Sequence, residues 1–218
     1  FNRPWFIKPG TVGHAIRGTE TRIADDGELL IRGPQVMAGY YKNDAATKEV
    51  FTDDGFFRTG DIVMIDEDGC LKITGRIKDI IVTAGGKNIS PQNIENSVKN
   101  SRYVEQIAVI GDRRKFLSAL VVPAFPELEA WAKQQGVAYG AVTDLLTNAK
   151  VLELFRKEID ENTAQFARVE QIRKFTLIKA EWTQVTGELT PTQKVKRRVI
   201  EKKYAAEIDA MYADETGD

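Results

Sequence analysis

The stretch GRIKDIIVTAGGKNISP, residues 75–91, marks the point at which the chain changes character. It contains a short apolar run, residues 80–82, and then a turn with two glycines. Ser90 and Pro91 predict the start of a helix, because serine is a good N-cap residue and proline is favoured at the first helical position. The stretch therefore predicts a domain boundary near residues 75–79.

The region before this boundary, residues 1–75, has the pattern of short strands joined by tight turns. Two hairpins are indicated by pairs of short apolar runs around an Asp-Gly turn, one in residues 21–31 and one in residues 62–74. Asn43 is placed to cap a short helix over residues 44–51. Several short strands of this kind predict a small β-barrel-like subdomain rather than a βαβ unit.

The region after the boundary, residues 79–218, interleaves apolar strands with amphipathic helices. The pattern predicts strands at residues 106–110, 118–122 and 172–178, and helices at residues 126–135, 150–165 and 194–212. This alternation is typical of an α+β layer, so the whole chain is expected to be an α+β protein.

The composition excludes several classes of protein. The chain has 218 residues, and its 31 Lys and Arg against 32 Asp and Glu give no electrostatic case for nucleic acid. The single histidine excludes a multi-histidine metal site, and we expect no metal site in this chain. The single cysteine, Cys70, excludes an intrachain disulfide and favours a reducing, cytoplasmic compartment. Cys70 is expected to be a packed thiol without a histidine partner.

Four motifs stand out for their order and separation. They are GELLIRG at residues 27–33 with GYYK at 39–42, FFRTGD at 56–61, the stretch at 75–91, and LTPTQKVKRR at 189–198. Together they resemble the adenylate-forming superfamily of acyl-CoA synthetases, adenylation domains and luciferases. The third and fourth motifs are most similar to the long-chain fatty acid–CoA ligase branch.

Asp61 is the first candidate site residue. A carboxylate in a Thr-Gly-Asp turn can accept two hydrogen bonds from a vicinal diol such as a ribose, although an aspartate that only caps a loop is the alternative. The resemblance implies that Asp61 binds the ribose of ATP or AMP, and that Arg76 assists at the hydroxyls or the phosphate.

Lys194 is the candidate catalytic residue. A compact ammonium can bridge a carboxylate and an α-phosphate as negative charge develops between them. The resemblance implies that Lys194 does this during adenylation, although Gln193 stands where the family commonly has glycine. The alternative is that the six cations of residues 194–203 form a solvated basic face that binds an anionic surface.

Two further roles follow only from the resemblance. The resemblance implies a hinge at residues 76–78, in which Lys78 matches the residue about which the C-terminal domain rotates between two half-reactions. Gly85 and Gly86 match a turn beside the channel for CoA, where the missing Cβ atoms let backbone lie close to a pantetheine arm.

The resemblance also implies what else the protein needs. The family's phosphate loop, Mg²⁺ site and acyl pocket correspond to positions before Phe1, and the chain begins without an initiator Met, so we expect a C-terminal piece of a longer ligase that is inactive alone. The expected partners are a fatty acid, ATP, CoA and the N-terminal domain of the same protein. An aromatic or short-chain acid, an acyl carrier protein and peripheral membrane contact stay open as alternatives.

Overall fold

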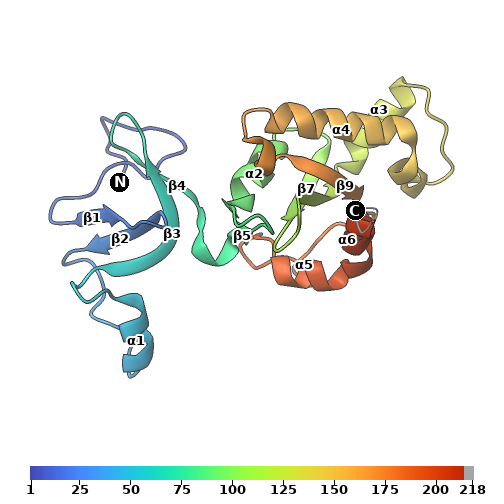
Figure 1. The fold of residues 1–218 in the computed structure, drawn as a ribbon. Coiled ribbons are helices and arrows are strands. Elements are labelled where there is room, and N and C mark those ends of the chain that lie inside the picture. Colours follow the sequence, from blue (N-terminus) through green and yellow to red (C-terminus); the bar gives the residue numbers. More distant parts are fainter. Residues whose placement is uncertain (214–218) are drawn as a thin grey trace. The chain divides into compact units, whose positions relative to one another are not determined.

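The computed structural model describes residues 1–213 and divides into two compact units, Phe1–Ile80 and Ile81–Asp218. Figure 1 shows that the first unit consists mainly of strands and that the second combines strands with helices. The α+β class expected from the sequence is therefore confirmed. Each unit is built around its own sheet.

The first unit is a four-stranded antiparallel sheet in the order β1-β2-β3-β4, with one helix, α1 (Asp44–Val50). The strands are β1 (Glu20–Ile23), β2 (Glu28–Arg32), β3 (Phe57–Ile65) and β4 (Leu71–Arg76). The sheet is open, which corrects the expectation of a barrel-like closure. The physical reason is that β1 is a four-residue edge strand exposed along its whole length, too short to pair with β4 and close the sheet.

The turns of this sheet form where the sequence predicts them. Gly27 and Gly69 have φ values of +84° and +76°, in the left-handed region that glycine adopts without a steric penalty. Asn43 caps α1, and its side chain accepts a hydrogen bond from the backbone N–H of Ala46 at 3.1 Å. These features depend on neighbouring residues only, which explains why local patterns find them.

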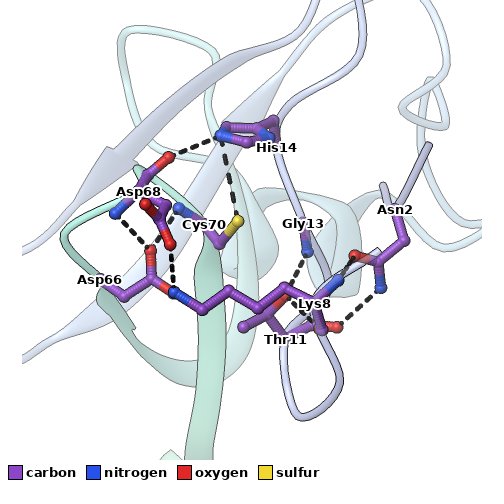
Figure 2. A network of polar contacts seen from close by, with 8 residues as sticks. All are labelled: Asn2, Lys8, Thr11, Gly13, His14, Asp66, Asp68 and Cys70. Carbon is purple, nitrogen blue, oxygen red and sulfur yellow. Dashed lines mark hydrogen bonds and ion pairs between the residues drawn. The ribbon is translucent and has the colours of Figure 1, made fainter. Parts of the chain in front are cut away.

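A polar network fastens the first residues of the chain to the turn between β3 and β4 (Figure 2). The Lys8 ammonium forms ion pairs with Asp66 at 2.8 Å and Asp68 at 2.5 Å, and its hydrogen bond lowers the pKa of the Asp66 carboxyl. His14 Nε2 lies 2.8 Å from the Asp68 carbonyl oxygen and 3.9 Å from Cys70 Sγ. Cys70 is completely buried, as expected of a packed thiol, but the expectation that it has no histidine neighbour is wrong.

The second unit is a three-stranded sheet in the order β7-β8-β9 between two layers of helices. β7 (Val104–Ile110) pairs with β8 (Leu117–Pro123) antiparallel, and β8 pairs with β9 (Ile172–Leu177) parallel. A separate pair, β5 (Ile81–Val82) and β6 (Asn88–Ile89), surrounds the glycine turn.

The helices of this unit cover both faces of the sheet because β8 is buried on both sides. One hydrophobic cluster joins Leu117, Ala119 and Val121 to α2 (Pro91–Val98), α3 (Phe125–Gln134) and α4 (Ala149–Thr163). The other joins Leu120 and Val122 to α5 (Arg197–Lys203) and α6 (Ala205–Tyr212). The alternation along β8 is the two-residue period of a strand. Three short 3₁₀ helices complete the fold: Ile77–Asp79, Val142–Thr147 and Arg168–Glu170.

The single helix expected over residues 194–212 is wrong. Residues 194–196 belong to a hairpin loop, and Tyr204, with φ −111° and ψ 30°, separates α5 from α6. Tyr204 is held by Trp182, whose Nε1 donates a hydrogen bond to the Tyr204 hydroxyl at 3.3 Å. The helix is therefore interrupted at a residue that binds Trp182, which lies outside residues 194–212. Within residues 1–213 there is no helix of sufficient length and apolar character to cross a membrane.

Candidate functional site

The structure brings Asp61 and Arg76 together on neighbouring strands. They are paired residues of β3 and β4, and Arg76 Nε forms an ion pair with Asp61 Oδ1 at 2.9 Å. The Asp61 side chain is 29% exposed, and within residues 1–213 its carboxylate has no other ion pair and accepts no hydrogen bond. One carboxylate oxygen is thus oriented by a cation, while the other remains free to accept hydrogen bonds from a ligand.

The sequence predicted that Thr-Gly-Asp forms a connecting turn. It forms an irregularity inside β3 instead. Gly60 has φ +71°, and the register of β3 shifts against both of its neighbours. The buried carboxylate of Glu28 accepts hydrogen bonds from the Gly60 N–H and from Arg58 Nη1, each at 2.9 Å. Thr59 Oγ1 donates to the Leu29 carbonyl at 2.7 Å. These contacts fix the backbone that carries Asp61.

Glu28 supports the backbone of the candidate site, a role that the sequence analysis did not assign. Its side chain is only 3% exposed, although it stands at the start of the apolar run Leu-Leu-Ile of β2. A glutamate at the start of a buried strand requires hydrogen-bond or ion-pair partners, so its position in the sequence could have indicated a structural role.

A cavity of about 440 Å³ in the first unit is lined by Gly60, which precedes Asp61, and by its partner Arg76, but not by Asp61 itself. Tyr40 and Lys78 also line it. Its size lies within the range of small-molecule sites. Lys78 stands in the 3₁₀ helix Ile77–Asp79 at the end of the first unit, and within residues 1–213 its ammonium has no ion pair. The hinge assignment of Lys78 stays a prediction.

The glycine turn of the second unit is closed by two backbone hydrogen bonds, from Gly86 N–H to the Thr83 carbonyl and from Thr83 N–H to the Lys87 carbonyl. Gly86 has φ +74°, so the turn itself favours glycine there. Gly85 has no such requirement, because a Cβ at that position would meet only Thr83 Oγ1, at 3.9 Å. Nothing inside the described chain explains glycine at residue 85, which is compatible with a ligand that approaches closely.

A second cavity, of about 650 Å³, adjoins this turn. Gly85 lines it together with four cationic side chains and one carboxylate: Lys87, Lys115, Arg168, Arg173 and Asp160. Such an excess of cations favours an anionic ligand. Sequence reasoning missed this group, because its members come from four separate segments and form no local pattern.

Lys194 lies in a hairpin loop whose ends are bridged by Leu189 and Val195. Thr190 fastens the loop: its N–H donates to the Lys194 carbonyl at 2.8 Å, and its Oγ1 accepts from the Lys194 N–H at 3.0 Å. The Lys194 side chain is exposed, and within residues 1–213 its ammonium has no hydrogen bond or ion pair. Gln193 has φ +61°, a left-handed conformation that glycine would adopt without a steric penalty.

The six cations of residues 194–203 do not form one uninterrupted basic face. Arg197 is paired with Glu95 at 2.7 Å, and Lys203 is paired with the buried Glu188. Two of the six charges are thus neutralised inside the unit, which weakens the alternative of an anionic-surface binder.

The candidate residues are divided between the two units. Asp61, Arg76 and Lys78 belong to the first unit, and Gly85, Gly86 and Lys194 belong to the second. Lys194 does not line the cavity beside Gly85. Within residues 1–213, no group of three or more His, Cys, Asp or Glu side chains is arranged to hold a metal ion.

Comparison with known proteins identifies the class. The C-terminal domain of AMP-binding enzymes matches residues 78–216, and the chain belongs to that family. The adenylate-forming superfamily that the four motifs resemble is thereby confirmed.

One curated relative indicates the branch of the superfamily to which this chain is similar. The long-chain-fatty-acid–CoA ligase FadD15 of Mycobacterium tuberculosis is 44% identical over 210 residues, covering 96% of this chain and 35% of that protein. The chain therefore spans about a third of the length of this relative.

Solved structures agree with the fold. The adenylation domain of a carboxylate reductase from Mycobacterium chelonae has a TM-score of 0.70 at 26% identity, covering 94% of this chain and 30% of that one. ATP-bound MatB from Rhodopseudomonas palustris has a TM-score of 0.61 at 28% identity, covering 90% of this chain and 36% of that one.

Proposed function

We propose that the full-length protein is an AMP-forming long-chain fatty acid–CoA ligase and that this chain supplies its C-terminal part. The single observation that carries the proposal is the Lys194 loop, a closed hairpin that presents an exposed ammonium without an ion pair among residues 1–213. The similarity to FadD15 supports the choice of long-chain acids over the aromatic and short-chain alternatives.

In the first half-reaction, a fatty acid carboxylate oxygen attacks the α-phosphorus of ATP, and the bond to the β-phosphate breaks to release pyrophosphate. Lys194 stabilises the negative charge that develops between carboxylate and phosphate. Asp61 accepts hydrogen bonds from the ribose hydroxyls through the carboxylate oxygen that Arg76 leaves free, and so positions the nucleotide. Mg²⁺ binding belongs, in this proposal, to the rest of the full-length protein.

In the second half-reaction, the CoA sulfur attacks the acyl carbon and AMP leaves. The proposal places the pantetheine arm beside Gly85 and Gly86, where Gly85 leaves room for it. The adjoining cavity lined by Lys87, Lys115, Arg168 and Arg173 suits the phosphate groups of CoA by size and charge. In this proposal, rotation of the second unit about Lys78 moves Lys194 away from the reaction centre and brings the turn with Gly85 and Gly86 to it.

The decisive experiment replaces Lys194 by Ala in the full-length enzyme. Adenylation, measured as pyrophosphate release, is expected to fall about 100- to 1,000-fold, because one charge-stabilising group is lost. Conversion of supplied acyl-AMP to acyl-CoA is expected to stay close to that of the wild type. Lys196→Ala, two residues further along the same segment, is the matched control and is expected to leave both half-reactions largely intact. An equal loss of both half-reactions in Lys194→Ala would contradict the assigned role.

A second experiment tests the hinge. Lys78→Pro fixes φ and removes a backbone N–H at the proposed rotation point, so the acyl-AMP to acyl-CoA step is expected to fall selectively. Lys78→Ala keeps the backbone free and serves as the control. Equal activity of the two variants in the second step would exclude a backbone hinge at residue 78.

The isolated chain offers a separate check. We expect it to release no pyrophosphate from ATP and fatty acid, because the groups that bind the triphosphate and the acyl chain lie elsewhere in the proposed protein. Turnover by the isolated chain would refute this division of labour.

A further inference from the structure

Arg197 stands three residues after Lys194, at the first position of α5. Its side chain is 19% exposed, and its Nη2 donates to Glu95 Oε1 at 2.7 Å. Its Nη1 donates to the backbone carbonyl of Val109. Arg197 therefore joins the end of the Lys194 loop to both α2 and β7.

Glu95 completes this contact from the other side. Its side chain is 10% exposed, and its Oε1 also accepts the Val109 N–H at 2.8 Å. The N–H and the carbonyl of Val109 are thus bound by opposite members of one ion pair. Because β7 is an edge strand of the sheet, these two backbone groups have no neighbouring strand to bind.

The other end of the loop is fastened as well. Lys196 N–H donates to the Glu188 carbonyl at 2.7 Å, and the Glu188 carboxylate is buried and paired with Lys203 of α5. Lys194 itself is exposed and touches none of these groups. The position of its ammonium is consequently set by the residues on either side of the loop.

The Glu95–Arg197 pair is a poor device for stability alone. Burying two charges carries a desolvation cost that an apolar pair of similar size avoids. Within the described chain, Arg197 Nε is also buried without a hydrogen-bond partner. An apolar pair in its place would not fix the position of the Lys194 loop through directed hydrogen bonds.

We propose that Glu95 and Arg197 are positioning residues for adenylation, which hold the Lys194 loop against α2 and β7 so that its ammonium reaches the reacting carboxylate and α-phosphate. This inference rests on the function proposed above. It adds two residues that contact neither substrate, and it predicts an effect confined to the half-reaction that uses Lys194.

The test uses the full-length enzyme with the variants Arg197→Met, Glu95→Gln and the double variant. A displacement of about 1 Å at a reacting group costs on the order of 100-fold in rate, so we expect kcat for adenylation to fall about 10- to 100-fold in each. KM for ATP and the conversion of supplied acyl-AMP should change by less than about threefold. Arg102→Met, which removes a cation from an exposed ion pair with Glu127, is the matched control.

The double variant separates positioning from stability. With both charges removed, no unpaired buried charge is left, so its thermal unfolding midpoint should return close to the wild-type value even if the single variants fold poorly. Adenylation should remain low. Recovery of adenylation together with stability would show a purely structural pair and overturn the inference, as would a proportional fall of both half-reactions.

The failure of this inference can be told apart from the failure of the proposed function. If Lys194→Ala abolishes adenylation but Arg197→Met and the double variant do not, only the positioning role is wrong. If Lys194→Ala leaves adenylation intact, both are wrong.

Discussion

The two units carry the candidate residues on different kinds of support. Both hydrophobic clusters among the described residues lie in the second unit. The first unit buries few apolar side chains and exposes many, among them Trp5 at 79% and Tyr41 at 87%. Its parts are connected largely by hydrogen bonds and ion pairs, such as those of Lys8 with Asp66 and Asp68. The difference indicates that the second unit has a core of its own, whereas the first presents apolar surface suited to contact with other protein.

The largest expected effect comes from separating the units. Residues 81–218 expressed alone are expected to unfold in one cooperative transition, because burial of apolar surface is the dominant stabilising contribution to folding. Residues 1–80 alone are expected to show no cooperative transition. Circular dichroism during heating and amide hydrogen exchange measure both. A cooperative transition of the shorter fragment would break the comparison.

A smaller effect is expected from Glu188, a buried charge of the second unit. Burial raises the pKa of Glu188, but the hydrogen bonds from Lys203 and Thr186 outweigh it, so the pKa lies below its usual 4.5. Glu188→Gln is expected to lower the free energy of unfolding by about 1–2 kcal/mol at pH 7, with Lys203 still partly solvated.

The pH dependence of that loss has a definite sign. A carboxyl with a lowered folded-state pKa stabilises fully above its unfolded pKa and loses this contribution as pH falls through the folded value. The difference between wild type and Glu188→Gln should therefore shrink below pH 4.5. In the first unit, Arg22 holds the pKa of the exposed Asp54 at about 2, and Asp54→Asn is the control, with a much smaller effect at pH 7. An equal loss of unfolding free energy in Glu188→Gln and Asp54→Asn would contradict the expectation that the buried ion pair stabilises more than the exposed one.

The smallest effect concerns a turn residue. The first unit places glycine at left-handed positions of its hairpins, whereas the Lys194 loop places Gln193 there. Gln193→Gly is expected to raise the free energy of unfolding by about 0.5 kcal/mol, because relief of left-handed strain exceeds the added freedom of the unfolded chain. Gln134→Gly, at the last residue of helix α3, is the matched control and should lower it by about 0.5 kcal/mol. Chemical denaturation measures the free energy of unfolding of both variants. A lower free energy of unfolding in Gln193→Gly would contradict the inference that Gln193 is strained.

Local chemistry explains which parts of the fold could be predicted. The Asp-Gly hairpins, the Asn43 cap and the Pro91 helix start each depend on a few adjacent residues, and all are found close to the expected positions. Ser90 occupies the N-cap position of α2 but makes no capping hydrogen bond with its side chain. Of the candidate site, the resemblance implied that Asp61 and Arg76 act together, and the structure places them in an ion pair.

The remaining features depend on residues that lie far apart in sequence. The irregularity that carries Asp61 is held by Glu28 of another strand. Tyr204, where the last helix is interrupted, is held by Trp182. The cationic cavity beside Gly85 gathers side chains from four segments. None of these contacts leaves a periodic signal, so a pattern read along the chain does not contain them.

The parallel pairing of β8 with β9 has a consequence for synthesis. β9 joins the sheet only after α3 and α4 have been made, since Leu117 pairs with Ile172, and such distant pairing is intrinsically slow. The segment with Lys194 is translated later still. During synthesis on the ribosome the sheet can therefore form before Lys194 emerges, and a prematurely terminated chain that ends after β9 would lack this lysine altogether.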